Sequence, residues 1–168
     1  MSVFRELLAI KAFRENQAEG AMRAQRQALA DAVAAREQAE DLLARLLREG
    51  LQIEQQLYRE LCERLVRLRD IEDVQLSVAG LRQREAAQQQ ALEQAEQAQR
   101  EQDEKLVSAR AAHQEAARQK SKFVDLARNW DQLQSREAER REDLEMEEAA
   151  SVARDREEWQ GHDPEAGA

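Results

Sequence analysis

A mostly apolar stripe with alternating spacings of three and four residues follows the second half of the chain. It runs Val74, Val78, Leu81, Glu85, Gln88, Leu92, Ala95, Gln99, Gln102, Leu106, Ala109, His113, Ala116, Lys120, Phe123, Ala127 and Trp130. This spacing places its members on one side of an α-helix, and its persistence is typical of the seam of a coiled coil. We therefore expect a long helix that pairs along this stripe, with no second layer that could enclose a pocket for chemistry.

A similar stripe follows the first half of the chain. It runs Val3, Leu7, Ile10, Ala18, Ala21, Ala28, Ala32, Ala35, Ala39, Leu42, Leu46, Gly50, Ile53, Leu57, Leu61, Leu65 and Leu68. Alanine permits two helices to approach closely but buries little area, and each buried methylene contributes only about 0.8 kcal/mol. The pattern predicts a slender and marginally stable middle section.

The two stripes together predict an all-α fold, a long two-helix antiparallel coiled-coil hairpin. We expect one hairpin over residues 1–160, with helices over about 2–66 and 71–159 and a turn over about 67–70. The segment 161–168 contains the only proline and is expected to be a disordered tail.

Local signals support this position of the turn. Asp70 is a candidate N-cap for the second helix, with Asp73 at its third helical position. Gly80 is an alternative break, but Val78 and Leu81 keep the stripe in phase across it. We therefore expect Gly80 to lie inside the second helix.

Charge at the two ends favours the hairpin over the alternative, a continuous parallel dimer. Residues 1–26 carry five basic and three acidic groups, whereas residues 136–160 carry five basic and ten acidic groups. An antiparallel fold is expected to place these ends side by side. The effect is modest, because an exposed ion pair contributes about 0–1 kcal/mol.

The composition and charge of the chain exclude several classes of function. Of 168 residues, 36% are charged and only 4% are aromatic, which is typical of a long helix or coiled coil. A net charge of −9 argues against nucleic-acid partners, which need a basic surface. No window is apolar enough for membrane insertion, and the charged N-terminus does not resemble a signal peptide. A lone Cys62 fits a reducing compartment, so we expect a cytoplasmic protein.

Candidate chemistry is sparse. The residues three before His113 and His162 are Arg110 and Trp159, so the Glu-x-x-His motif of di-metal helix bundles is missing. There is also no glycine-rich phosphate loop. We expect no catalytic residue, no metal site and no cofactor, with His113 tuning register on the seam and Cys62 packing beside it.

Several large apolar residues widen the stripes near the chain ends and near the turn. They are Phe4, Leu8, Phe13, Phe123, Leu126, Trp130 and Leu133 at the ends, and Val74, Leu76, Val78 and Leu81 near the turn. They could thicken a local core, close a homodimer or dock another protein, since exposed apolar patches mark interfaces. Trp159 is isolated in an acidic run and is interpreted either as a capping contact or as an anchor.

Four segments together resemble one known family. They are 10–14 (IKAFR) followed by 18–25 (AEGAMRAQ), 81–86 (LRQREA), 121–128 (SKFVDLAR) and the acidic end 144–159. In this order they resemble the YscO (SctO) proteins of type III secretion systems, a family similar to the flagellar protein FliJ. The resemblance implies a non-enzymatic central stalk in the cytoplasm, peripheral to the secretion apparatus at the inner membrane.

The resemblance also implies partners. The paired termini would insert into the hexameric secretion ATPase, the turn end would face the cytoplasmic ring of the export gate, and secretion chaperones are further partners. The ATPase-facing residues carried over by position are Ile10, Phe13, Met22, Phe123 and Leu126, and the gate-facing residues are Val74, Val78, Leu81 and Glu85. The family tends to have an aromatic residue near position 74, where this chain has valine.

Three other hypotheses remain open from the sequence. A structural or adaptor coiled coil would self-associate through the same stripe. A carboxylate-bridged metal bundle would take up metal, and the flagellar export homologue would work in a different machine by the same mechanism.

Overall fold

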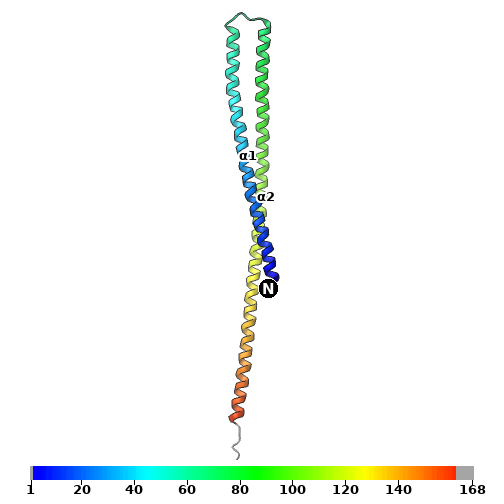
Figure 1. Cartoon of the computed structure of the whole chain (residues 1–168), viewed down its shortest axis with the longest axis vertical. Coiled ribbons are helices and arrows are strands. Elements are labelled where there is room, and N and C mark those ends of the chain that lie inside the picture. The colour runs from blue at the N-terminus through cyan, green and yellow to red at the C-terminus, as the bar shows by residue number, and fades with distance from the viewer. Residues whose placement is uncertain (1, 162–168) are drawn as a thin grey trace, which may run out of the picture. The chain divides into compact units, whose positions relative to one another are not determined.

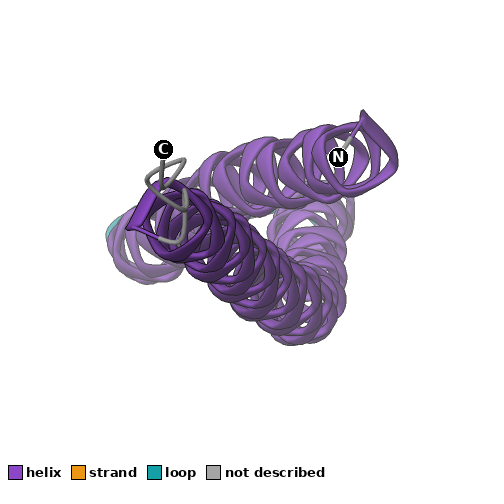
Figure 2. Ribbon diagram, turned by 90° about the horizontal axis from the view of Figure 1, so that it is seen from below, coloured by secondary structure: helices purple, strands orange, loops and turns teal. Residues whose placement is uncertain are grey.

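The computed structural model describes residues 2–161 as two helices joined by a short loop (Figure 1). Helix α1 spans Ser2–Cys62 and helix α2 spans Leu68–Gly161. Figure 2 shows helix along all of the described chain apart from this loop. The predicted all-α hairpin is therefore confirmed. The expected disordered tail lies outside the described residues, except that Gly161 is the last residue of α2.

The turn comes earlier than we predicted, over residues 63–67. Arg67 is the residue that caps α2, because its carbonyl oxygen accepts hydrogen bonds from the N–H groups of Asp70 and Ile71, at 3.0 and 3.4 Å. Asp70 lies at the third helical position, and its Oδ2 accepts a hydrogen bond of 3.0 Å from the Arg67 N–H. The prediction of Asp70 as the N-cap was wrong, because the N-cap is Arg67, three residues earlier. The Asp70 carboxylate instead reaches back from the first turn of the helix to the N–H of the N-cap residue, as in a capping box.

The chain divides into two compact units, each built from parts of both helices. The hairpin unit is Arg14–Ala116, and the terminal unit comprises Met1–Phe13 and Ala117–Ala168. In the hairpin unit, α1 and α2 run antiparallel from the loop. In the terminal unit, the first turns of α1 pack beside α2.

The seam predicted for α2 is confirmed along its length. Every position of the stripe from Val74 to Ala127 is buried or half-buried, and Leu92 and Leu106, at 8% and 4% exposed, are the buried apolar side chains among the described residues. Trp130 is 38% exposed at the end of the stripe. The alternating spacing of three and four residues thus identified the packed face of this helix, including its polar positions.

The seam predicted for α1 is only partly correct. The members that are buried or half-buried are Leu7, Ala18, Ala28, Ala32, Ala39, Leu46, Gly50, Leu57 and Leu61. The members that are exposed are Val3, Ile10, Ala21, Ala35, Leu42, Ile53, Leu65 and Leu68. Polar residues take several seam positions instead, and these are Glu15, Gln25, Arg36 and Glu54. Alanine occurs on every face of α1, so apolarity alone did not identify the face that meets α2.

Polar contacts across the hairpin unit hold these residues in place. The Gln25 Nε2 donates hydrogen bonds to Gln102, to its Oε1 at 2.6 Å and to its main-chain oxygen at 3.0 Å. Gln88 Nε2 donates to the carbonyl oxygen of Ala39 at 3.0 Å. Each bond joins residues far apart in sequence and is available in one alignment of the helices, so these contacts specify register.

A glutamate enters the seam near the turn because a glycine faces it. Gly50 is buried, and a Cβ atom there would stand 2.7 Å from Glu85 Oε1. Arg82 pairs with both Glu85 and Glu54. The hydrogen bond that Arg82 donates to Glu85, followed by the attraction of the Glu54 carboxylate, raises the pKa of the Arg82 guanidinium.

The expected pairing of opposite charges at the two ends is wrong. In the terminal unit, the rings of Phe4 and Trp130 lie 5.6 Å apart, so α1 begins level with this part of α2. The acidic segment 136–160 continues beyond that point, and all residues from 128 to 161 are exposed. The cause is length, because α2 has 94 residues and α1 has 61.

Candidate binding surfaces

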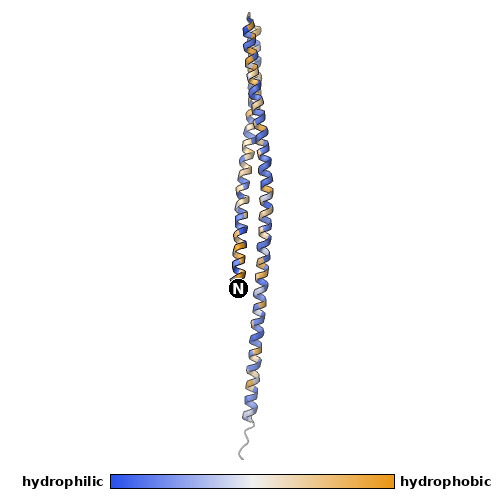
Figure 3. Ribbon diagram, turned by 90° about the vertical axis from the view of Figure 1, so that its right-hand side faces the viewer, coloured by the Kyte–Doolittle hydropathy of each residue, from blue (hydrophilic) through white to orange (hydrophobic). Residues whose placement is uncertain are grey.

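The terminal unit carries exposed apolar side chains on both of its helical segments. We call this set the terminal apolar surface, and it consists of Val3, Ile10, Phe13, Leu126, Trp130 and Leu133. An α-helix turns by about 100° per residue. Counted in this way, the three residues of α2 lie on one flank of the seam, and Val3 and Ile10 lie on the same flank of α1. Figure 3 shows the hydrophobic residues that gather near the start of α1.

These side chains stay exposed because two helices bury only one face of each other. The seam of the terminal unit uses Phe4, Leu7 and Leu8 from α1, and these are half-buried. The Lys11 Nζ lies 5.0 Å from the centre of the Phe123 ring, a cation–π contact that covers one face of that ring. Apolar residues on the flank have no third helix to cover them within the described chain.

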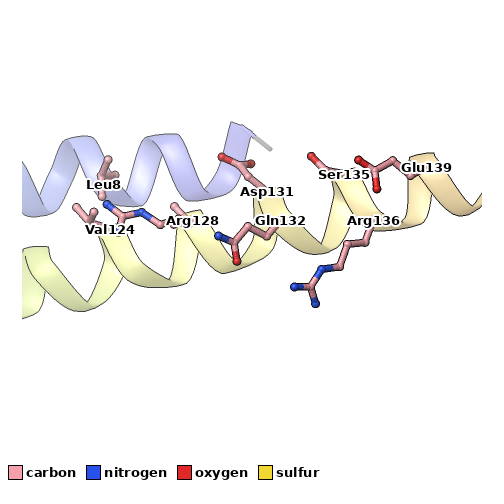
Figure 4. Close-up of a pocket in the computed structure, with 9 residues that line it drawn as sticks. Leu8, Val124, Arg128, Asp131, Gln132, Ser135, Arg136 and Glu139 are labelled. Carbon is pink, nitrogen blue, oxygen red and sulfur yellow. The ribbon is translucent and has the colours of Figure 1, made fainter.

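A shallow groove runs along the other flank of the same unit (Figure 4). Leu8 of α1 and Val124 of α2 form its apolar part, while Arg128, Asp131 and Glu139 make its edge charged. Figure 4 shows Arg136 projecting away from α1. The groove is thus more polar than the terminal apolar surface, and the two flanks of this unit differ in chemistry.

The structure separates the predicted ATPase-facing residues by exposure. Ile10, Phe13 and Leu126 belong to the terminal apolar surface and are 48%, 62% and 50% exposed. Phe123 is half-buried beneath Lys11. Met22 is half-buried in the hairpin unit.

The predicted gate-facing residues do not lie on an open surface. Val74, Val78, Leu81 and Glu85 are all half-buried on the seam that faces α1, and the Glu85 carboxylate is paired with Arg82. The stripe that we used to select them is therefore the packed face of the hairpin.

Different residues expose apolar surface near the turn. They are Leu47, Leu51, Tyr58, Leu65, Leu68 and Leu76, and we call this set the turn apolar surface. Leu51 and Tyr58 are seven residues apart and lie on one face of α1, and Leu65 is exposed in the loop that follows. This second stripe beside the seam was visible in the sequence, but we did not distinguish it from the seam itself.

Two further predictions concern single residues. Cys62 is exposed at the end of α1 and does not pack beside the seam as expected. Trp159 is 84% exposed, so it makes no capping contact, and its role as an anchor stays a prediction. With Val152 and Arg156 it lines a shallow depression near the end of α2.

Within residues 2–161, neither helix contains an apolar stretch of the length needed to cross a membrane.

Comparisons with known proteins agree with this geometry. A family model described as Type III secretion protein YscO matches residues 4–152. The crystal structure of the type III secretion protein YscO from Vibrio parahaemolyticus superposes with a TM-score of 0.81 at 26% sequence identity, over 88% of this chain and 92% of that one. Among the curated proteins, none matches.

Proposed function

The chain belongs to the YscO family of type III secretion proteins and acts in the secretion apparatus. We propose that it is a non-enzymatic stalk that docks into the secretion ATPase through its terminal unit. The observation that carries this proposal is the terminal apolar surface. Phe13, Leu126 and Leu133 are each at least half exposed in a unit that has no further helix to cover them. Apolar surface of this kind marks an interface with another protein.

The second contact of the proposed stalk is with the cytoplasmic ring of the export gate. We assign this contact to the turn apolar surface and no longer to Val74, Val78, Leu81 and Glu85, which are half-buried against α1. Leu51 and Tyr58 are 53% and 47% exposed and lie on one face of α1. Secretion chaperones are a further class of partner for the same exposed surfaces.

The coupling mechanism follows from the asymmetry of the terminal unit. One flank carries Val3, Ile10, Leu126, Trp130 and Leu133 of the terminal apolar surface, and the other carries the groove edged by Arg128, Asp131 and Glu139. In a six-membered ATPase ring around such a unit, identical subunits would face different flanks of the stalk, some the apolar side chains and others the charged groove. Each subunit would therefore bind the stalk differently, which biases hydrolysis around the ring and links it to the gate without any catalytic group from this chain.

The ATPase contact is tested by measuring ATP hydrolysis by the cognate secretion ATPase as the full chain is titrated in. We expect saturable stimulation by the wild type and its loss in the double variant Phe13→Ala, Leu126→Ala. Both residues are at least half exposed, so the variant should keep its fold. The matched control is Val107→Ala, an exposed apolar residue of the hairpin unit, which should stimulate like the wild type.

The same measurement separates the stalk from a self-associating adaptor. If the folded protein leaves the ATPase rate unchanged and instead forms a dimer that the double variant loses, the adaptor hypothesis is correct and the stalk is not. The gate contact is tested separately with the cytoplasmic domain of the export gate. Leu51→Ala with Tyr58→Ala should abolish that binding, whereas Val107→Ala should retain it.

A further inference from the structure

We propose that Glu15, Glu19 and His113 form a binding site for a divalent transition metal ion of the Zn²⁺ class that links α1 to α2 within the hairpin unit. The three residues offer one ligand atom each, and these atoms all lie within 4.8 Å of one another. All three side chains are half-buried. One imidazole and two carboxylates are a donor set that suits zinc and its neighbours in the first transition row.

The fold explains why these residues meet. Glu15 and Glu19 are four residues apart on α1, so their side chains lie on the same face one turn from each other. His113 lies on the seam of α2, and its Nε2 is 3.4 Å from Glu15 Oε1. In a tetrahedral site with metal–ligand bonds of about 2.1 Å, neighbouring donors are about 3.4 Å apart. The histidine and Glu15 therefore already have the separation of two ligands, and Glu19 closes the set by rotation of its side chain.

A second observation concerns the imidazole nitrogen itself. The Nε2 atom of His113 is shielded from solvent, and apart from its 3.4 Å contact with Glu15 Oε1, which does not meet hydrogen-bond geometry, it has no hydrogen-bond partner in the described part of the chain. A polar atom in that condition is costly, because it has lost water without a full replacement. A metal ion at this point would use its lone pair, and a water molecule would complete the fourth position.

Charge around the site sets the expected strength of binding. The two carboxylates carry two negative charges, which a divalent ion balances. Glu19 also pairs with Arg23 at 2.7 Å, so the metal must compete with the guanidinium for that carboxylate. We therefore expect a site weaker than one whose ligands are all unpaired. The search for a Glu-x-x-His motif in the sequence did not find this cluster, because its ligands come from two helices and meet only in the hairpin.

The experiment is titration of Zn²⁺, followed by Co²⁺ as a spectroscopic probe, into the full metal-free chain. We expect one metal per chain, cobalt absorption in the visible range and a rise in the unfolding temperature with Zn²⁺. His113→Ala and Glu15→Gln should each weaken binding by at least about tenfold. The matched controls are His162→Ala, which removes the other histidine, and Glu104→Gln, which removes an exposed carboxylate of α2; both should bind like the wild type.

Helicity of each variant, measured by circular dichroism, separates loss of metal from loss of fold. Because His113→Ala also removes a seam contact, Glu19→Gln provides a second measure that leaves the His113–Glu15 pair in place. Failure of the wild type to bind one metal per chain would mean that the cluster is an ion pair only. Binding that survives in folded His113→Ala and Glu15→Gln would equally overturn the proposal. Neither result bears on the ATPase contact, whose test uses other residues and another readout.

Discussion

The backbone of Gly50 lies against the carboxylate of Glu85, where a Cβ atom would stand 2.7 Å from Oε1. Glycine in the middle of a helix costs about 1 kcal/mol relative to alanine. At position 50 the missing side chain leaves the space that a glutamate occupies on the seam. Arg82 holds that glutamate by an ion pair of 3.1 Å, so its carboxylate is not free to move aside without loss.

Gly50→Ala should therefore gain little or nothing in the wild-type chain. In a Glu85→Ala background the same substitution should stabilise by about 1 kcal/mol, because only helix propensity then changes. The double-mutant cycle, measured by urea unfolding, should give a coupling free energy of about 1 kcal/mol between the two positions. The controls are Gly20→Ala and Gly80→Ala, since both glycines are helical and have nothing within 4 Å of an added Cβ. Equal stabilisation by all three substitutions would contradict the proposed contact.

Leu106 should contribute more to stability than any exposed apolar residue near it. It is 4% exposed on the α2 seam, whereas its neighbour Val107 is 64% exposed. Leu106→Ala removes buried methylenes and leaves a cavity, so we expect a loss of about 2–4 kcal/mol in the free energy of unfolding. Val107→Ala should change it by less than about 0.5 kcal/mol. Similar effects of the two changes on chemical unfolding would show that this part of the seam is not packed.

The Gln25–Gln102 pair should act on register more than on stability. Gln25→Leu alone leaves the amide of Gln102 without its cross-helix partner and should destabilise by about 1–3 kcal/mol. Changing both glutamines to leucine removes the unsatisfied group and should recover most of that loss. Chemical unfolding gives the free energies, and cross-linking of cysteines introduced across the helices reports register. A double variant as unstable as the single one would show that the hydrogen bond itself supplies the stability.

The extension of α2 beyond α1 should be dispensable for folding. All residues from 128 to 161 are exposed, and Phe4 already packs level with Trp130. A chain that ends at Arg141 should therefore unfold at the same temperature as the full chain, within about 2 °C. Thermal unfolding by circular dichroism is the measurement. A large drop in that temperature would mean that the extension packs on the rest of the protein.

The sequence by itself determined the fold class, the number of helices and the packed face of α2. On α2 the large apolar residues near both ends of the stripe, with Leu92 and Leu106 between them, share one helical face, and the alternating spacing of three and four residues extends this face through the polar positions. The family resemblance was also visible in short segments of the sequence, because those segments keep their order along the chain. The turn was placed within a few residues, since Asp70 does take part in the cap, although from the third helical position.

Only the tertiary structure decided which face of α1 meets α2 and which apolar residues remain exposed. Alanine covers every side of α1, so the choice depends on polar contacts such as Gln25 with Gln102 and on the space at Gly50. The same alignment leaves Val74 half-buried and Leu51 and Tyr58 exposed, and it brings Glu15 beside His113. These contacts join residues tens of positions apart. A local pattern carries the period of one helix, but it does not carry the register between two.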